Sequence, residues 1–257
     1  MKSWLKSMGG TGLVVVSAAF AVAACSSTAA DKYPSSDSFC EAKAKEECQV
    51  TARCGVTEVS CLTARKQACS SFVTQSTGGS RQYRSANADG CVNKVHDVYS
   101  GTAPITPAIQ GEIDAACSKV FQGTTKALGA CEATIDCEGD LICDKKLCAS
   151  KVTKNSGELC GNPGEICASG SFCDASGGAA QCKNKKGRDE VCNANAPCNE
   201  SLRCNNSCRD RFAAGESCGS NDDCASSAPF CDPTNGNKCG AGLIFAPGAG
   251  SCKAYGG

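Results

Sequence analysis

Apolar residues between positions 38 and 122 recur every three or four residues, which is the spacing of amphipathic helices. A first helix is predicted to begin at Ser38, with Glu41 completing a capping box, and to stop at Gly55. Three further helices are predicted, over residues 60–73, over residues 91–99, and after the cap Thr106 with Pro107 in the first turn. The expected apolar faces are Cys40, Ala44, Cys48 and Ala52; Leu62, Cys69, Phe72 and Val73; Val92, Val95 and Tyr99; and Ile109, Ile113, Cys117 and Val120.

Several cysteines fall on these predicted faces. Cys40 and Cys48 are eight residues apart, as are Cys61 and Cys69, and eight residues of helix span about 12 Å. A disulfide needs Cα atoms within about 7 Å, so neither pair can close inside one helix. Residues 38–122 are therefore predicted to form a disulfide-stapled α-helical module with bridges between helices. Its cysteines are Cys40, Cys48, Cys54, Cys61, Cys69, Cys91 and Cys117.

The helical spacing ends before Cys131, and four cysteine-rich repeats fill residues 131–239. Each has a large apolar residue one or two positions before its third cysteine and Asp or Asn directly after it. One such side chain contributes only about 1.5–3 kcal/mol, whereas a bridge closing about 15 residues contributes around 3 kcal/mol. We therefore predict β-hairpins held by disulfides. The repeats are 131–148 (Cys131, Cys137, Cys143, Cys148), 160–182 (Cys160, Cys167, Cys173, Cys182), 192–208 (Cys192, Cys198, Cys204, Cys208) and 218–239 (Cys218, Cys224, Cys231, Cys239).

Four cysteines allow three pairings within a repeat, and the sequence does not decide among them. We favour first with third and second with fourth, because the third and fourth cysteines would lie on the two arms of a tight hairpin. A direct clasp between the third and the fourth is the alternative.

The amino end contains an apolar run from Gly12 to Ala24, preceded by Lys2 and Lys6. This arrangement is typical of a signal peptide, and the run is shorter than the roughly 20 apolar residues of a membrane-spanning helix. Residues 1–24 are therefore predicted to be a signal peptide and not part of the fold.

The residues Val22-Ala23-Ala24-Cys25 resemble the bacterial lipobox. The resemblance implies cleavage before Cys25, acylation of its thiol and a membrane anchor made of acyl chains. Residues 25–37 are polar and would form a lipidated tether. The alternative is an ordinary signal peptide cut after Ala23, which would leave Cys25 for a disulfide. The total of 25 cysteines favours lipidation, because the remaining cysteines are then even in number.

The same parity argument predicts a bridge between modules. Without Cys25, the helical module holds an odd number of cysteines, the repeats an even number, and the Gly/Ala-rich tail of residues 240–257 holds Cys252. We therefore predict that Cys252 or a cysteine of the first repeat pairs with the helical module.

The rhythm of the repeats, three evenly spaced cysteines with Asp or Asn after the third, resembles the Dickkopf amino-terminal cysteine-rich domain and, more loosely, EGF-like modules. The whole order of lipobox, helical segment with RQYRSANADGCVNKV, and repeats resembles cysteine-rich surface lipoproteins of myxobacteria. This resemblance implies export and lipid anchoring to a bacterial membrane, at the outer membrane or cell surface. A shared cysteine rhythm does not transfer the receptor-regulating role of Dickkopf proteins.

Composition and spacing disfavour other chemistry. Lys plus Arg and Asp plus Glu both number 26, so the chain has no excess of positive charge that would attract nucleic acid. The absence of any C-x2-C pair favours disulfides over zinc, and no cofactor is predicted. The oxygen-rich stretches Asn221–Asp223 and Asp232–Asn237 are better explained by turn formation than by calcium binding.

These observations predict a small disulfide-rich, non-enzymatic surface protein with a structural role or a recognition role toward an unidentified protein or glycan. Inhibition of an exported protease or another enzyme through a repeat loop is the alternative. A third hypothesis is an enzyme centred on His96, the only histidine, but no nucleophile motif accompanies it.

Overall fold

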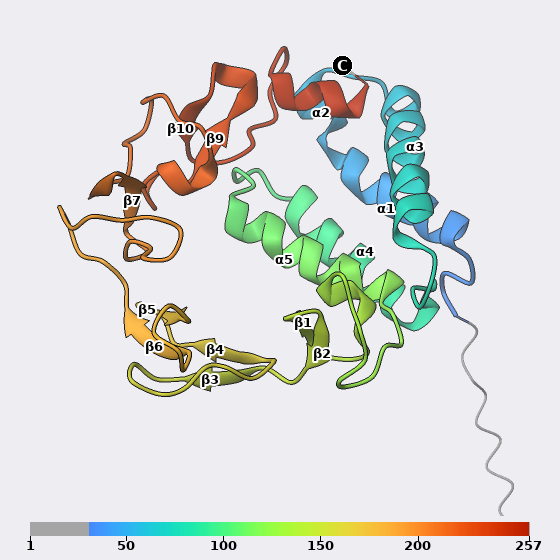
Figure 1. Cartoon of the computed structure of the whole chain (residues 1–257). Coiled ribbons are helices and arrows are strands. Elements are labelled where there is room, and N and C mark those ends of the chain that lie inside the picture. Colours follow the sequence, from blue (N-terminus) through green and yellow to red (C-terminus); the bar gives the residue numbers. More distant parts are fainter. Residues whose placement is uncertain (1–30, 257) are drawn as a thin grey trace, which may run out of the picture. The chain divides into compact units, whose positions relative to one another are not determined.

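The computed structural model describes residues 31–256, so the predicted signal peptide and the predicted lipid attachment at Cys25 lie outside the described residues. Helices form the first part of the described chain and two-stranded sheets the second, which confirms the predicted fold class (Figure 1). The helices are α1 (Ser36–Glu47), α2 (Thr51–Cys54), α3 (Glu58–Ser76), α4 (Ser85–Tyr99) and α5 (Pro107–Ser118). The strands are β1 (Ile142–Asp144), β2 (Leu147–Ala149), β3 (Val152–Lys154), β4 (Glu165–Cys167), β5 (Ser171–Asp174), β6 (Gln181–Asn184), β7 (Leu202–Asn205), β8 (Ser207–Asp210), β9 (Phe230–Asp232) and β10 (Lys238–Gly240).

Helix α1 begins earlier than the sequence predicts. Its cap is Ser35, whose side chain accepts a hydrogen bond from the backbone N–H of Ser38, while Ser38 Oγ accepts one from the backbone N–H of Ser35. The predicted capping box of Ser38 with Glu41 is therefore wrong. Ser38 occupies the third helical position, and its hydroxyl accepts the hydrogen bond from the cap residue that a Glu or Gln side chain usually accepts.

The first predicted helix is also interrupted. A 3₁₀ turn at Cys48–Val50 separates α1 from α2. A 3₁₀ turn has fewer residues per turn than an α-helix, so it changes the direction in which later side chains point. Ala52 is consequently exposed and does not continue the apolar face. Gly55 ends α2 in the left-handed conformation, as predicted.

The last two long helices follow the sequence closely. Thr106 caps α5 by accepting a hydrogen bond from the backbone N–H of Ile109, and Pro107 is its first residue. Helix α4 starts before the predicted segment but buries the expected Val92, Val95 and Tyr99. In α3 the expected face is only partly covered, because Phe72 remains 43% exposed.

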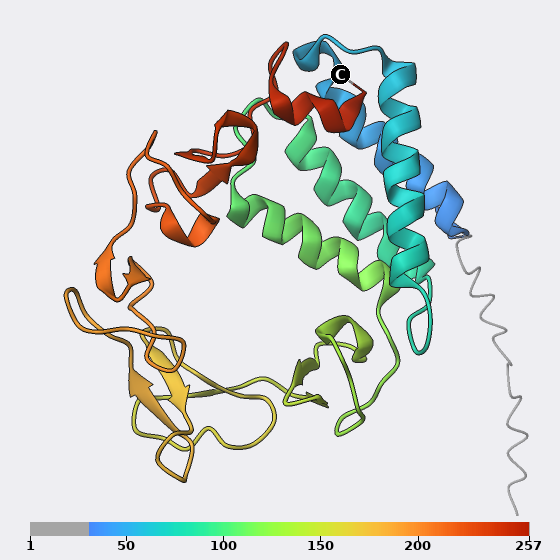
Figure 2. The ribbon, with the colours of Figure 1, turned by 45° about the horizontal axis from the view of Figure 1, so that its top comes forward.

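The helices share one apolar core. At its centre the rings of Phe39 and Phe121 meet edge to face, with centroids 6.0 Å apart. The C-terminal segment belongs to the same core, to which it contributes Phe245, Cys252 and Tyr255, and it packs beside α3 (Figures 1 and 2). The stretch that looks like a Gly/Ala-rich tail in the sequence therefore helps to bury the helical module.

Each repeat contains one antiparallel hairpin: β1 with β2, β5 with β6, β7 with β8, and β9 with β10. In every hairpin the third and fourth cysteines are direct partners in the register, as Cys143 and Cys148 are in the first. The first turn places Lys145 and Lys146 at φ 50° and 64°, the left-handed pair that a tight two-residue hairpin requires. Strands β3 and β4 form a separate parallel pair.

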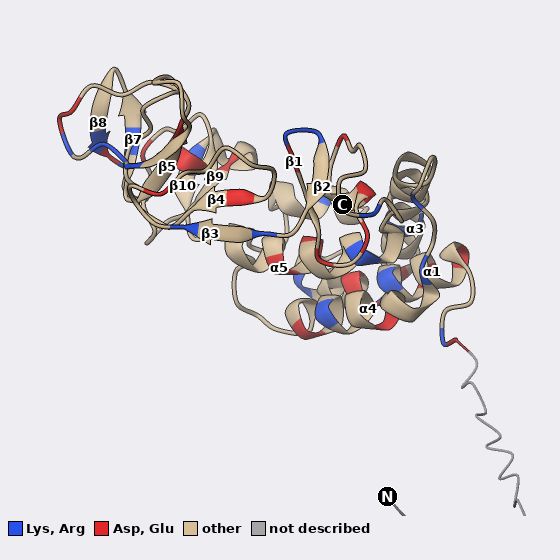
Figure 3. Ribbon diagram, turned by 60° about the horizontal axis from the view of Figure 1, so that its bottom comes forward, with Lys and Arg blue, Asp and Glu red and all other residues tan. Residues whose placement is uncertain are grey.

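Basic and acidic residues are interspersed over both the helical part and the hairpins (Figure 3). Within residues 31–256 no helix combines the length and the apolar character needed to cross a membrane.

Candidate functional site

All cysteines that the structure describes are paired, in twelve disulfides. In the helical module each bridge joins two elements, as predicted. Cys40–Cys69 links α1 to α3, Cys48–Cys61 links the 3₁₀ turn to α3, and Cys91–Cys117 links α4 to α5. Disulfide bonding on this scale is typical of exported or extracellular proteins.

The favoured pairing, first with third and second with fourth, is confirmed in all four repeats. Although the third and fourth cysteines face each other across the hairpin, they do not bond; each reaches to a loop that packs on the hairpin. The bridges are Cys131–Cys143, Cys137–Cys148, Cys160–Cys173, Cys167–Cys182, Cys192–Cys204, Cys198–Cys208, Cys218–Cys231 and Cys224–Cys239. The alternative clasp between third and fourth cysteines is therefore wrong.

The two bridges of each repeat lie against each other. In the first repeat the sulfur atoms of Cys131, Cys137 and Cys148 fall within 4.8 Å of one another, and each other repeat also has three sulfur atoms this close together. Such clusters have the dimensions of a metal site, but the thiolate is the form that binds metal, and these sulfurs are bonded to sulfur. The clusters are stacked disulfides that replace an apolar core.

The predicted bridge between modules is Cys54–Cys252, with 198 residues of separation. The backbones of Ile105, before α5, and Leu243, in the C-terminal segment, also exchange two hydrogen bonds of 3.0 and 2.9 Å. At the other junction, Arg81 Nε lies 2.5 Å from Asp136 Oδ1 in the first repeat. The hydrogen bond from Arg81 holds the pKa of Asp136 at about 2, well below its ordinary value.

Neighbouring repeats are also joined by polar contacts. Lys145 Nζ donates to the backbone oxygens of Cys160, Gly161 and Asn162 at 2.8–3.1 Å. The turn of the first hairpin is therefore hydrogen-bonded to the start of the second repeat. In the third repeat, Glu200 Oε1 accepts hydrogen bonds from the backbone N–H of Gly170 and from Lys185.

The segment that precedes each repeat pairs in parallel with the loop that carries the second cysteine of that repeat. Strand β3 pairs with β4 in this way, and the isolated bridges Thr125↔Cys137, Lys186↔Cys198 and Phe212↔Cys224 repeat the arrangement. The contact therefore recurs at every entry into a repeat.

The short polar segments that precede the first cysteines of the later three repeats stabilise turns. Glu158, Glu190 and Glu216 each stand two residues before a first cysteine, and each carboxylate accepts a hydrogen bond from the backbone N–H three residues earlier. These acids cap turns and so are structural.

The residues considered for catalysis or calcium also have structural partners. His96 is exposed on α4, with Nδ1 2.8 Å from Glu46 Oε2 and 3.0 Å from Gln49 Nε2. Asp223 accepts hydrogen bonds from two backbone N–H groups of its own turn, and Asp232 accepts one from Thr234 N. Both aspartates act as turn residues, in line with the favoured interpretation.

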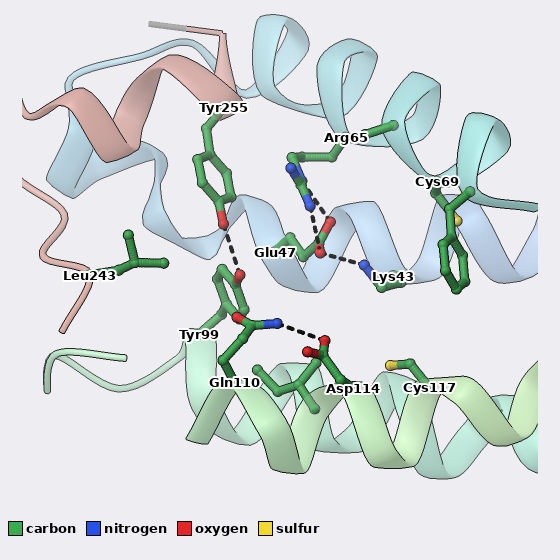
Figure 4. Close-up of a pocket in the computed structure, with 13 residues that line it drawn as sticks. Lys43, Glu47, Arg65, Cys69, Tyr99, Gln110, Asp114, Cys117, Leu243 and Tyr255 are labelled. Atoms are coloured by element: carbon green, nitrogen blue, oxygen red, sulfur yellow. Dashed lines mark hydrogen bonds and ion pairs between the residues drawn. The ribbon is translucent and has the colours of Figure 1, made fainter. Parts of the chain in front are cut away.

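The helical module contains a cavity of about 340 Å³ that the sequence does not reveal. Its lining comes from α1, α3, α5, the end of α4 and the C-terminal segment (Figure 4). Glu47 of α1, only 3% exposed, forms one wall together with Lys43 and Arg65. Asp114 of α5 lies on the opposite side (Figure 4).

Glu47 is held by two cations. Arg65 donates to it from Nε at 2.8 Å and from Nη2 at 2.9 Å, and Lys43 Nζ lies 2.5 Å from Oε1. Burial alone would raise the pKa of Glu47, but the hydrogen bonds from Arg65 and the charge of Lys43 outweigh it, so its pKa is below the ordinary value. The carboxylate therefore stays ionised at neutral pH.

Comparisons with protein-family models, with curated proteins and with solved structures returned no match.

Proposed function

We propose that the protein is an exported, lipid-anchored and non-enzymatic recognition protein whose repeats display variable hairpin turns on a constant frame. The observation that carries the proposal is that one bridge pattern recurs four times while the turns between the third and fourth cysteines differ. These turns are DKKL, DASGGAAQ, NNS and DPTNGNK. Variable loops on a rigid scaffold are a common basis of binding.

The anchor rests on the lipobox-like Val22-Ala23-Ala24-Cys25 and on cysteine parity. The described cysteines are all paired with one another, which leaves Cys25 without a partner among them. Its expected modification is measured by intact mass after expression in a lipid-modifying bacterium, without reduction. We expect acyl mass on a chain that begins at Cys25, and a Cys25→Ala variant that lacks it. An unmodified Cys25 thiol would refute the anchor.

Recognition is separated from a purely structural role by exchanging turns. A variant carries Gly/Ser turns of the natural lengths in all four repeats, and a disulfide map verifies that its bridges are intact. Labelled wild-type protein should bind to intact cells or envelope glycans of the producing bacterium, and the variant should not. Equal binding of both proteins would indicate a structural role, and absence of binding by wild type would reject recognition at this surface.

The inhibitor hypothesis stays a prediction and concerns the same turns. A panel of exported proteases, assayed with wild type and the Gly/Ser variant, tests it directly.

A further inference from the structure

The cavity of the helical module has opposite charge on its two sides. On one side Lys43 and Arg65 supply two positive charges against the single carboxylate of Glu47. On the other side Asp114 is exposed and accepts a hydrogen bond of 2.8 Å from Gln110 Nε2. Within residues 31–256 no Lys or Arg forms an ion pair with Asp114. The cavity therefore has an excess of positive charge facing an excess of negative charge.

Both sides retain hydrogen-bonding capacity. The ammonium group of Lys43 has three N–H donors and gives one to Glu47. The carboxylate of Asp114 has about four acceptor sites, of which Gln110 uses one. In Figure 4 Lys43 and Asp114 extend from α1 and α5 toward the space between these helices.

Apolar side chains complete the lining between the charged groups. Ile113 and Leu243 contribute to it, and so does Phe72, which is 43% exposed although large. The Phe72 ring is fixed edge to face against Phe121, at a centroid distance of 5.6 Å. Because Phe72 is held in this way, the cavity presents a preformed apolar surface.

We propose that this cavity binds a small zwitterion, a free α-amino acid or a short peptide with an apolar side chain. The ligand carboxylate is placed at Lys43 and Arg65, its ammonium group at Asp114, and its side chain on Phe72. A simple anion would face Asp114 and a simple cation would face Lys43 and Arg65, so only a ligand with both charges is matched on both sides. The cavity volume is at the lower end of the range for small-molecule sites, and an extended dipeptide spans only about 7 Å.

This inference does not depend on the proposed role of the repeat turns. The test is calorimetric titration of the oxidised full-length protein in detergent with L-leucine and L-leucyl-L-leucine. The matched probes are N-acetyl-leucine, which lacks the positive charge, and leucinamide, which lacks the negative charge. We expect at least one zwitterion to bind, and each blocked probe to bind roughly tenfold to a hundredfold more weakly, which is the loss expected for one charge-assisted hydrogen bond.

Two variants locate the charges. Asp114→Asn should weaken binding of the zwitterion about tenfold or more but should not weaken binding of N-acetyl-leucine, because that probe has no ammonium group and faces one negative charge fewer in the variant. Lys43→Gln should have the converse effect, because it should weaken binding of the zwitterion but should not weaken binding of leucinamide. The controls are Asp97→Asn and Lys45→Gln, which change exposed residues outside the cavity and should not alter binding.

The proposal is overturned if neither zwitterion binds at concentrations up to roughly 10 mM, a range that would detect even weak millimolar sites. It is equally overturned if the blocked probes bind as well as the zwitterions, or if the control variants change binding as much as Asp114→Asn. Because Asp114 is exposed, the variant should fold, and an unchanged thermal unfolding curve verifies this.

Discussion

The hydroxyl oxygens of Tyr99 and Tyr255 lie 2.8 Å apart, although 156 residues separate the two tyrosines. Both residues are only 5% exposed, and the Phe245 ring packs against both of theirs. The guanidinium group of Arg65 lies over the Tyr255 ring, 4.8 Å from its centroid. The end of the chain is thus tied to the helical module by a polar contact inside an apolar cluster.

Replacing one tyrosine of this pair should cost more than replacing both. Tyr255→Phe leaves the Tyr99 hydroxyl buried without its partner, which we expect to lower the free energy of unfolding by about 1–3 kcal/mol. The double variant Tyr99→Phe with Tyr255→Phe removes both polar groups and should recover part of that loss. Urea unfolding of the four proteins measures the coupling, and simply additive effects would contradict it.

The same pair predicts sensitivity to alkali. Burial raises the pKa of Tyr99 and of Tyr255 above the ordinary value of 10.0. Folding therefore favours the protonated hydroxyls, so their contribution is fully present below pH 10 and is lost as the pH rises above it. Unfolding free energies measured at pH 7 and at about pH 11 should differ more for wild type than for the double phenylalanine variant. Equal differences would show that other groups govern the alkaline loss, such as Tyr83, whose pKa burial raises to about 12.

The bridge Cys54–Cys252 should stabilise the protein by less than its separation suggests. A loop of 198 residues would give the largest entropic effect, but the other disulfides already shorten the unfolded chain within it. We expect the double variant Cys54→Ala with Cys252→Ala to lose about 2–3 kcal/mol in urea unfolding.

The control for this bridge is Cys198→Ala with Cys208→Ala, whose cysteines are 10 residues apart in the third repeat. Its loss should be confined to the third repeat and leave the near-ultraviolet signal of the tyrosines in the helical module unchanged. A Cys54/Cys252 variant with wild-type stability would show that the core contacts of residues 243–255 hold the segment alone.

Removing the carboxylate of Glu47 should be strongly destabilising. Glu47→Ala leaves Lys43 and Arg65 close together without their counter-charge, and we expect a loss of about 3–5 kcal/mol. Glu41→Ala, on the same helix but with a side chain 72% exposed, is the control and should change stability little. A similar loss in both variants would point to helix propensity as the cause.

Glu47 should also make the stability of the protein depend on pH in the acidic range. Because its pKa is lowered on folding, its contribution is present above the ordinary value of 4.5 and is lost as the pH falls below it. The stability of Glu47→Gln should therefore depend less on pH than that of wild type between about pH 5 and pH 3, measured by thermal unfolding.

The cysteine framework could be predicted because its constraints are local or arithmetic. Helical spacing excluded Cys40 with Cys48, the hairpin geometry favoured the repeat pairing, and parity required a link such as that to Cys252. Each of these arguments uses positions that are near in sequence or a simple count. The cap Thr106 was equally local and equally clear.

The cavity could not be predicted in this way. Lys43 and Glu47 stand four residues apart and look like an ordinary surface pair on a helix. Only the packing of α3 on α1 brings Arg65 to Glu47, and only the docked C-terminal segment covers them with Tyr255. The error at Ala52 has a similar origin, since a short 3₁₀ turn leaves no mark in the apolar periodicity.

The parallel pairing at each repeat entry has a consequence for how such a chain can grow or shrink. Lys186 and Phe212 pair with the second cysteines of the third and fourth repeats. The interchangeable unit of the chain therefore runs from one pairing residue to the next, and not from the first to the fourth cysteine of a repeat. Residues 186–211 form one such unit. Duplication or excision of a unit with these boundaries would preserve every backbone pairing. A cut at the first and fourth cysteines would instead separate a repeat from the preceding segment with which it pairs.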